Sequence, residues 1–160
     1  KQIDGINAAK HEHCVVLTIS SFKFRIMCLL HLSLNKTTKQ FVADAIGVKT
    51  EDLDETAYLD YLLEMSNSFC GNLKRLLQNT CPPLGMSTPN LLDRTCLSFD
   101  NVFSISHQAH CSAIADYSEP ALFGASVLVN LQNPQDFKLP HYQDIEAESE
   151  VDNSGELELF

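Results

Sequence analysis

The sequence predicts an α+β fold, a largely antiparallel sheet with one long amphipathic helix packed on one of its faces. Residues 22–34 alternate in hydrophobicity as a β-strand does. Residues 50–79 instead repeat their apolar residues at helical spacing. Three more apolar segments, separated by turn-forming residues, follow residue 90. The expected order of two strands, two helices and three strands indicates that the helices lie against an antiparallel sheet.

The first half of the chain begins with two expected strands, at residues 11–20 and 22–34. One face of the second strand is entirely apolar. A short helix is expected to follow, from an N-cap at Asn35 through Ile46, because asparagine accepts the first free amide hydrogens of a helix. Gly47 is its expected stop.

The long helix is expected over residues 50–79, with an acidic, capping-box-like start at Asp52 and Glu55. It must end before Pro82, because proline cannot continue the hydrogen-bond ladder. A loop rich in proline, glycine, serine and threonine then runs to Pro89.

The second half of the chain contains expected strands at residues 91–99, 103–114 and 122–131. From Asn133 the hydrophobic pattern dissolves into Pro134, Pro140 and then an acidic end. We therefore expect one domain over residues 1–143 and a flexible acidic tail over residues 144–160.

Composition excludes several classes of function. The net charge is -10, but seven of the 21 acidic residues lie after Lys138, and 14 acidic residues face 11 basic ones in the rest of the chain. No basic stripe is visible there, so binding of nucleic acid is not expected. The longest apolar run, residues 26–34, is far too short to span a membrane, and no signal-peptide pattern begins the chain. We expect a soluble, cytoplasmic protein that does not bind membranes.

The cysteines and histidines do not predict a metal site. The six cysteines form no C-x-x-C pair and are expected to be reduced thiols. Residues 11–14 and 107–111 are both rich in histidine and cysteine, and could share a metal if their strands were adjacent. Strand alternation, however, sends His13 and the following cysteine to opposite faces, and His110 and the following cysteine likewise. Neither segment has a structural zinc spacing, so no metal is expected.

One face of the long helix is unusual for a solvent-exposed surface. Asp60, Glu64, Asn67 and Gly71 fall within an arc of roughly 60°, opposite the apolar side. Asparagine is a mediocre helix former, and glycine costs about 1 kcal/mol relative to alanine in a helix interior. Two readings stay open. Either a second molecule approaches this face closely, or two poor helix formers are tolerated on a surface.

A family resemblance bears on this choice. The expected helix carries Asp60, Glu64 and Asn67 in the spacing D-x3-E-x2-N, and 21 further residues lie between Asn67 and Pro89. This pattern resembles the signature of the CheC, CheX and FliY chemotaxis phosphatases, and the surrounding elements agree over residues 12–131. With a single copy of the motif, the chain looks CheX-like. The second long helix of the family is not evident in this sequence.

The resemblance implies a phosphatase that hydrolyses the aspartyl phosphate of a CheY-type response regulator. Asn67 would orient the attacking water, and Glu64 would pair with a lysine of the regulator. Asp60, Gly71 and Pro89 would serve partner binding, with Asp60 supporting docking and Gly71 allowing close approach. Mg²⁺ is expected in the partner's active site, and this chain needs no cofactor of its own. A homodimer formed through the sheets is also implied by the family.

An interaction module without catalytic activity is the alternative. The same helix face could bind a receiver domain, or serve in a flagellar-switch type of assembly, without dephosphorylating its partner. Asn67 discriminates between the two, because a pure binder has no need of an amide at that position. The tail segment 155–160 could dock in another protein's groove or be a solvated end.

Overall fold

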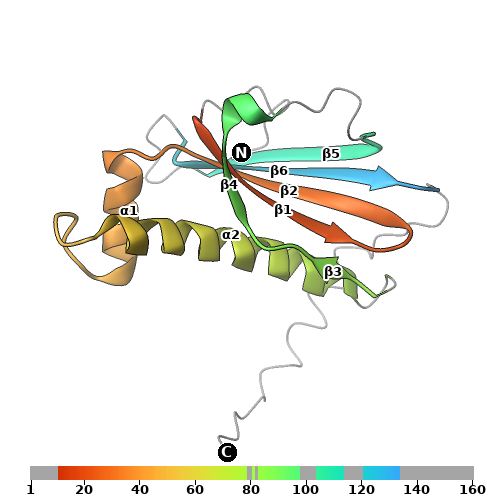
Figure 1. Cartoon of the computed structure of the whole chain (residues 1–160), viewed down its shortest axis with the longest axis horizontal. Helices are drawn as coiled ribbons and strands as arrows, with labels where there is room; N and C mark the ends of the chain where they lie inside the picture. The colour runs from red at the N-terminus through yellow and green to blue at the C-terminus, as the bar shows by residue number, and fades with distance from the viewer. Residues whose placement is uncertain (1–10, 79–80, 82, 98–103, 114–120, 134–160) are drawn as a thin grey trace, which may run out of the picture.

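The computed structural model describes residues 11–78, 81, 83–97, 104–113 and 121–133. These residues form a six-stranded antiparallel sheet with a long helix across one face, which confirms the predicted α+β class (Figure 1). In chain order the elements are β1 (His13–Ser20), β2 (Phe24–Leu32), α1 (Lys36–Ile46), α2 (Glu55–Gln78), β3 (Gly85–Met86), β4 (Asn90–Asp93), a 3-10 helix (Arg94–Cys96), β5 (His107–Ala113) and β6 (Phe123–Leu131).

The sheet has the spatial order β3, β1, β2, β6, β5, and β4 pairs with β1 on the same side as β3. Every pairing is antiparallel. The register aligns Cys28 of β2 with Leu17 of β1 on one side and with Val127 of β6 on the other. The centre of the sheet therefore joins segments that are far apart in the sequence, because β6 inserts between β2 and β5.

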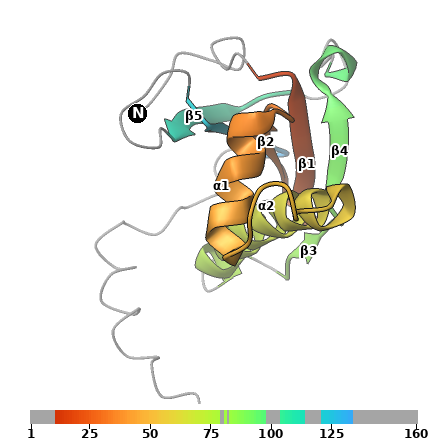
Figure 2. The ribbon, with the colours of Figure 1, turned by 90° about the vertical axis from the view of Figure 1, so that its left-hand side faces the viewer.

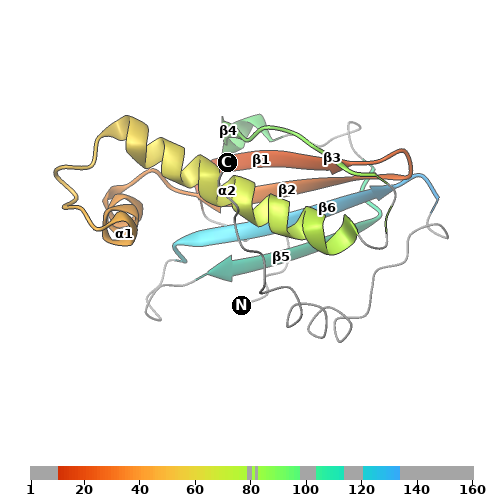
Figure 3. The same cartoon turned by 90° about the horizontal axis from the view of Figure 1, so that it is seen from below.

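Helix α2 lies across one face of this sheet, and α1 stands at one end of it (Figures 2 and 3). Most of the buried residues of α2 are four positions apart, a spacing that places them on one side of the helix, where they face the sheet. Its buried members are Tyr58, Leu62, Ser66, Cys70 and Leu77. The apolar ones join the main hydrophobic core with the side chains of β1 and β2 that face the helix.

Part of the opposite face of the sheet is buried as well. Cys14, Leu29 and Leu128 are fully buried there, and Leu97 packs against them. The sequence predicted only one apolar face for the second strand, but the last part of β2, from Cys28, is buried on both faces. Among the described residues, no helix is both long and apolar enough to cross a membrane.

The predicted helix caps are partly confirmed. The Asn35 side chain accepts a hydrogen bond of 3.0 Å from the Thr38 amide, and Gly47 ends α1 with φ of 75° in the left-handed region. The predicted start of the long helix is wrong, because α2 begins at Glu55 and Asp54 caps it with a bond of 2.9 Å from the Ala57 amide. The residues before it form turns instead of a capping box.

The segment after α2 departs most from the prediction. The predicted loop at residues 82–89 contains the short strand β3, which pairs with the end of β1. The predicted strand at 91–99 is wrong over residues 94–97, because the Asp93 carboxylate accepts bonds from the Thr95 amide and hydroxyl and so starts the 3-10 helix. Residues 98 and 99 lie outside the described residues. The two later strands are found as β5 and β6. Residues 104–106 of the predicted strand at 103–114 are not strand, and β6 begins one residue later than predicted. The predicted tail at 144–160 lies outside the described residues.

Candidate functional site

Helix α2 holds four of the predicted site residues on one surface, which we call the signature face: Asp60, Glu64, Asn67 and Gly71. The two carboxylates are exposed, and Asn67 and Gly71 are half-buried. The signature face lies on the side of α2 away from its buried residues, because the centres of the two sets are about 140° apart around the helix axis. The Asn67 carboxamide is therefore outside the core, one helical turn after Glu64.

The Glu64 carboxylate accepts hydrogen bonds from two nearby side chains of α2. The Asn67 amide nitrogen Nδ2 donates to Glu64 Oε2 at 3.5 Å. The Ser68 hydroxyl donates to the other oxygen, Oε1, also at 3.5 Å. Both distances are at the long end for hydrogen bonds, so these contacts orient the groups without fixing them rigidly. The sequence analysis did not single out Ser68, although its position four residues after Glu64 is the signal that could have identified it.

Gly71 is not required by the fold. A Cβ atom built on Gly71 would meet no atom within 4 Å, and the residue lies in regular α-helix. Helix α2 therefore has a small open area beside Asn67 where packing would accept a larger residue. This observation favours close approach of another molecule over a packing reason for the glycine.

Replacing Gly71 by alanine is expected to raise the free energy of unfolding by about 1 kcal/mol, because alanine restricts the unfolded chain and favours the helix. Urea denaturation of the parent and the Gly71→Ala variant measures this change. The same variant is expected to bind a partner more weakly if the signature face is a docking surface. A stabilised variant with unchanged partner affinity would leave Gly71 without a role in docking.

Pro89 lies on a different element from the other site residues. It is half-buried in the segment that joins β3 to β4. Ser87 anchors this segment to β1, since its amide donates to the Thr18 carbonyl and its hydroxyl accepts from the Thr18 amide, both at 2.9 Å. Helix α2 also packs against β1. Pro89 therefore lies in a segment attached to the strand against which the buried side of α2 packs.

Two histidines of the sheet form a buried polar cluster with a serine. Ser126 of β6 contacts His31 Nε2 of β2 at 2.7 Å and His110 Nδ1 of β5 at 2.8 Å. Strand alternation holds, because His110 is buried and Cys111 is exposed. In the part of the chain that the structure describes, no three histidine, cysteine, aspartate or glutamate side chains gather so that they could hold a metal ion.

Burial is the main cause that lowers the pKa of His31 to about 4, and the nearby His11, Arg94 and His110 act in the same direction. His31 is therefore neutral at physiological pH. No sequence pattern could have identified this cluster, because its three hydrogen-bonded members come from strands that pair only in the folded sheet.

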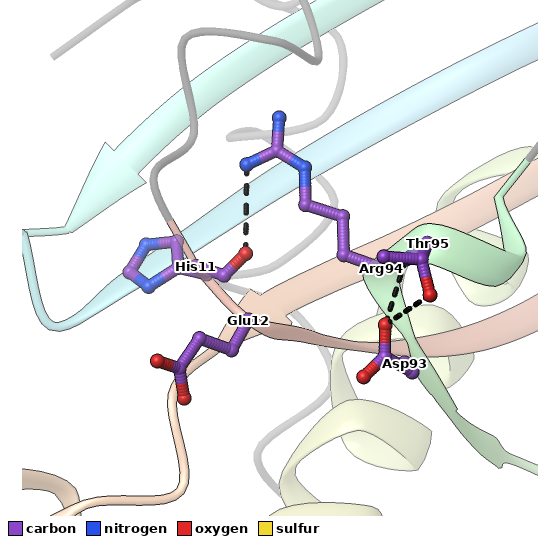
Figure 4. Close-up of a pocket in the computed structure, with 5 residues that line it drawn as sticks. All are labelled: His11, Glu12, Asp93, Arg94 and Thr95. Carbon is purple, nitrogen blue, oxygen red and sulfur yellow. Dashed lines mark hydrogen bonds between the residues drawn. The ribbon is translucent and has the colours of Figure 1, made fainter.

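A cavity of about 450 Å³ lies where β1 begins and β4 ends, and no residue of α2 lines it (Figure 4). Its lining residues are His11, Glu12, Asp93, Arg94 and Thr95. The Arg94 guanidinium donates to the His11 carbonyl at 3.5 Å. Because this cavity mixes a cation with two carboxylates, it has no clear preference for a charged ligand.

Comparison with solved structures identifies the fold. A CheC-like superfamily protein from Shewanella sp. PV-4 superposes with a TM-score of 0.59 at 14% sequence identity, covering 81% of this chain and 80% of that one. The chain has a CheC-like fold. The chemotaxis protein CheX from Vibrio vulnificus is also similar, with a TM-score of 0.58 and 15% identity over 81% of this chain and 82% of that one. No protein-family model matches the sequence, and no curated protein sequence matches it.

The CheC-like fold agrees with the resemblance that the sequence motif carries. The motif consists of four residue types at fixed spacing in the sequence, whereas the fold is defined by the arrangement of the sheet and α2.

Proposed function

We propose that this chain is a CheX-like phosphatase that hydrolyses the aspartyl phosphate of a CheY-type response regulator. The observation that carries the proposal is the signature face on a CheC-like fold. Asn67 lies outside the core on α2, in contact with Glu64 and next to a glycine that leaves space for a partner. A folded core gives no reason for this combination of residues.

The chemistry of the reaction suits a carboxamide. In the hydrolysis of an acyl phosphate, a water oxygen attacks phosphorus in line with the aspartyl oxygen, and the phosphorus bond to that oxygen breaks. Aspartate is a good leaving group, so catalysis depends mainly on holding the water in line. The Asn67 amide can both donate and accept hydrogen bonds, and it stays uncharged beside a phosphoryl group. Mg²⁺ expected in the partner's own pocket would neutralise charge on the phosphoryl oxygens.

The other members of the signature face would place the partner. Glu64 would pair with a lysine beside the partner's phosphorylated aspartate, because its carboxylate is exposed and lies one turn from Asn67. Asp60 would contact the edge of the docked surface, and Gly71 would let the backbone of α2 come close. Pro89 would contribute from the neighbouring segment of the sheet edge.

A phosphate-release assay tests this proposal. The purified chain would be added to phosphorylated receiver domains encoded in the same genome, and loss of phosphate would be compared with the spontaneous rate. Acceleration with one or more receivers supports the phosphatase. Binding of a receiver without any acceleration would support the alternative, a non-catalytic receiver-binding or flagellar-switch-type module.

Replacing Glu64 by alanine is expected to raise KM about tenfold, which corresponds to about 1.4 kcal/mol of lost docking energy. The physical reason is loss of the ion pair with the partner's lysine. Steady-state kinetics with the phosphorylated receiver measures the change. Glu55→Ala is the matched control, because Glu55 is an exposed carboxylate on the same helix but outside the signature face. An equal rise in KM for both variants would mean that the loss of one negative charge anywhere on α2 weakens docking, and would contradict a specific role for Glu64.

Two further properties are proposed from the same resemblance. We expect the chain to act in the cytoplasm and to form a homodimer through its sheet. Size-exclusion chromatography with light scattering would give the oligomeric state, and a monomer at the concentrations used in the assay would exclude the dimer.

A further inference from the structure

The contacts of Glu64 distinguish between the two ends of the Asn67 carboxamide. An asparagine side chain presents an acceptor, Oδ1, and a donor, Nδ2, which have nearly the same shape. On the signature face Nδ2 is directed at Glu64 Oε2, at 3.5 Å. A carboxylate can only accept, so it favours the orientation in which Nδ2 faces it and disfavours the reverse one.

The Glu64 carboxylate is itself restrained. The Ser68 hydroxyl donates to Oε1 while Asn67 donates to Oε2, so each carboxylate oxygen has one donor. Both donors come from the following turn of α2, which is regular helix over this stretch. The carboxylate is exposed, and these two long contacts orient it toward the turn that carries Asn67.

We propose that Glu64 has a second role, as a positioning residue that orients the Asn67 carboxamide so that Oδ1 faces the attacking water. This inference rests on the proposed phosphatase function and adds to it. The water must direct a lone pair at phosphorus, so its hydrogens point away from phosphorus, where an acceptor on this chain can bind one of them. With Nδ2 bonded to Glu64, Oδ1 is the atom that accepts that hydrogen. A flipped carboxamide would offer the water a donor and would compete for the lone pair that attacks.

A first experiment measures the orientation of the Asn67 carboxamide by NMR and does not depend on enzymatic activity. The side-chain NH₂ resonances of Asn67 are assigned by their loss in Asn67→Ala and compared at pH 7.5 among the parent, Glu64→Ala and Glu55→Ala. We expect Glu64→Ala to move the hydrogen-bonded amide proton upfield, because the bond to a carboxylate is lost, and Glu55→Ala to leave it in place. Equal resonances in the parent and Glu64→Ala would overturn the proposal.

A second experiment measures kcat after the hydrogen-bond donor at Asn67 and the acceptor at Glu64 have been exchanged. In Asn67→Asp, two carboxylates face each other across one turn and repel, and the donor is lost. Adding Glu64→Gln restores a donor, since the glutamine NH₂ can bond one oxygen of the carboxylate introduced at position 67 and leave the other facing outward. We expect kcat of the double variant to exceed that of Asn67→Asp by about tenfold, a coupling of about 1.4 kcal/mol.

The two experiments separate the inference from the function. A double variant that is no more active than Asn67→Asp overturns the positioning role, while an active parent still supports the phosphatase. A parent without activity toward any receiver contradicts the phosphatase, and the resonances of Asn67 then still decide whether Glu64 orients the amide.

Discussion

Asn67→Ala is expected to reduce kcat for aspartyl phosphate hydrolysis by about 100-fold or more, which is the size of effect found when a single positioned polar group is removed from an active site. The fold should survive. Asn67 is half-buried, its hydrogen bond to Glu64 is 3.5 Å long, and alanine is the better helix former. Partner binding should also survive, because Glu64 and Asp60 remain on the signature face.

The measurement combines turnover with binding. Phosphate release is followed for the parent and Asn67→Ala, and affinity is measured with a receiver that carries a stable phosphoryl analogue. Asn72→Ala is a matched control, because Asn72 is an exposed amide on α2 that bonds Arg75 outside the signature face. If Asn67→Ala were as active as the parent, the mechanism would be wrong although the CheC-like fold would stand.

Acidification from pH 8 to pH 5 is expected to lower the free energy of unfolding by about 2 kcal/mol through His31 alone. His31 is 1% exposed and contacts Ser126, and burial lowers its pKa from 6.5 to about 4. Below pH 6.5 the unfolded chain takes up a proton at His31 while the folded chain does not, so protonation favours unfolding. This stability is fully present above pH 6.5 and is lost as the pH falls toward 4.

Urea denaturation at the two pH values tests this expectation. His31→Gln should be less sensitive to acid than the parent by about the same 2 kcal/mol. His107→Gln serves as the control, because His107 is an exposed histidine on β5 of the same sheet. An NMR titration of His31 in the parent checks the cause directly, and a midpoint near the ordinary histidine value would refute it.

The sequence alone determined α2 and its signature face. Helical periodicity is local, so the spacing of Asp60, Glu64 and Asn67 already places them on one side, whatever the helix packs against. The N-cap of α1 could also be predicted from the sequence, because the Asn35 side chain accepts a hydrogen bond from an amide only three residues away. The alternation of the second strand also predicted the face that packs under α2.

Only the tertiary structure decided the features that depend on which strands pair. The end of β4 is an exception, because it is set locally by the bond between Asp93 and Thr95, and the sequence analysis missed this signal. Burial of the second face of β2, and the contacts of Ser126 with His31 and His110, require β6 to lie between β2 and β5. Cross-strand neighbours are set by packing over the whole domain, and no local pattern encodes them.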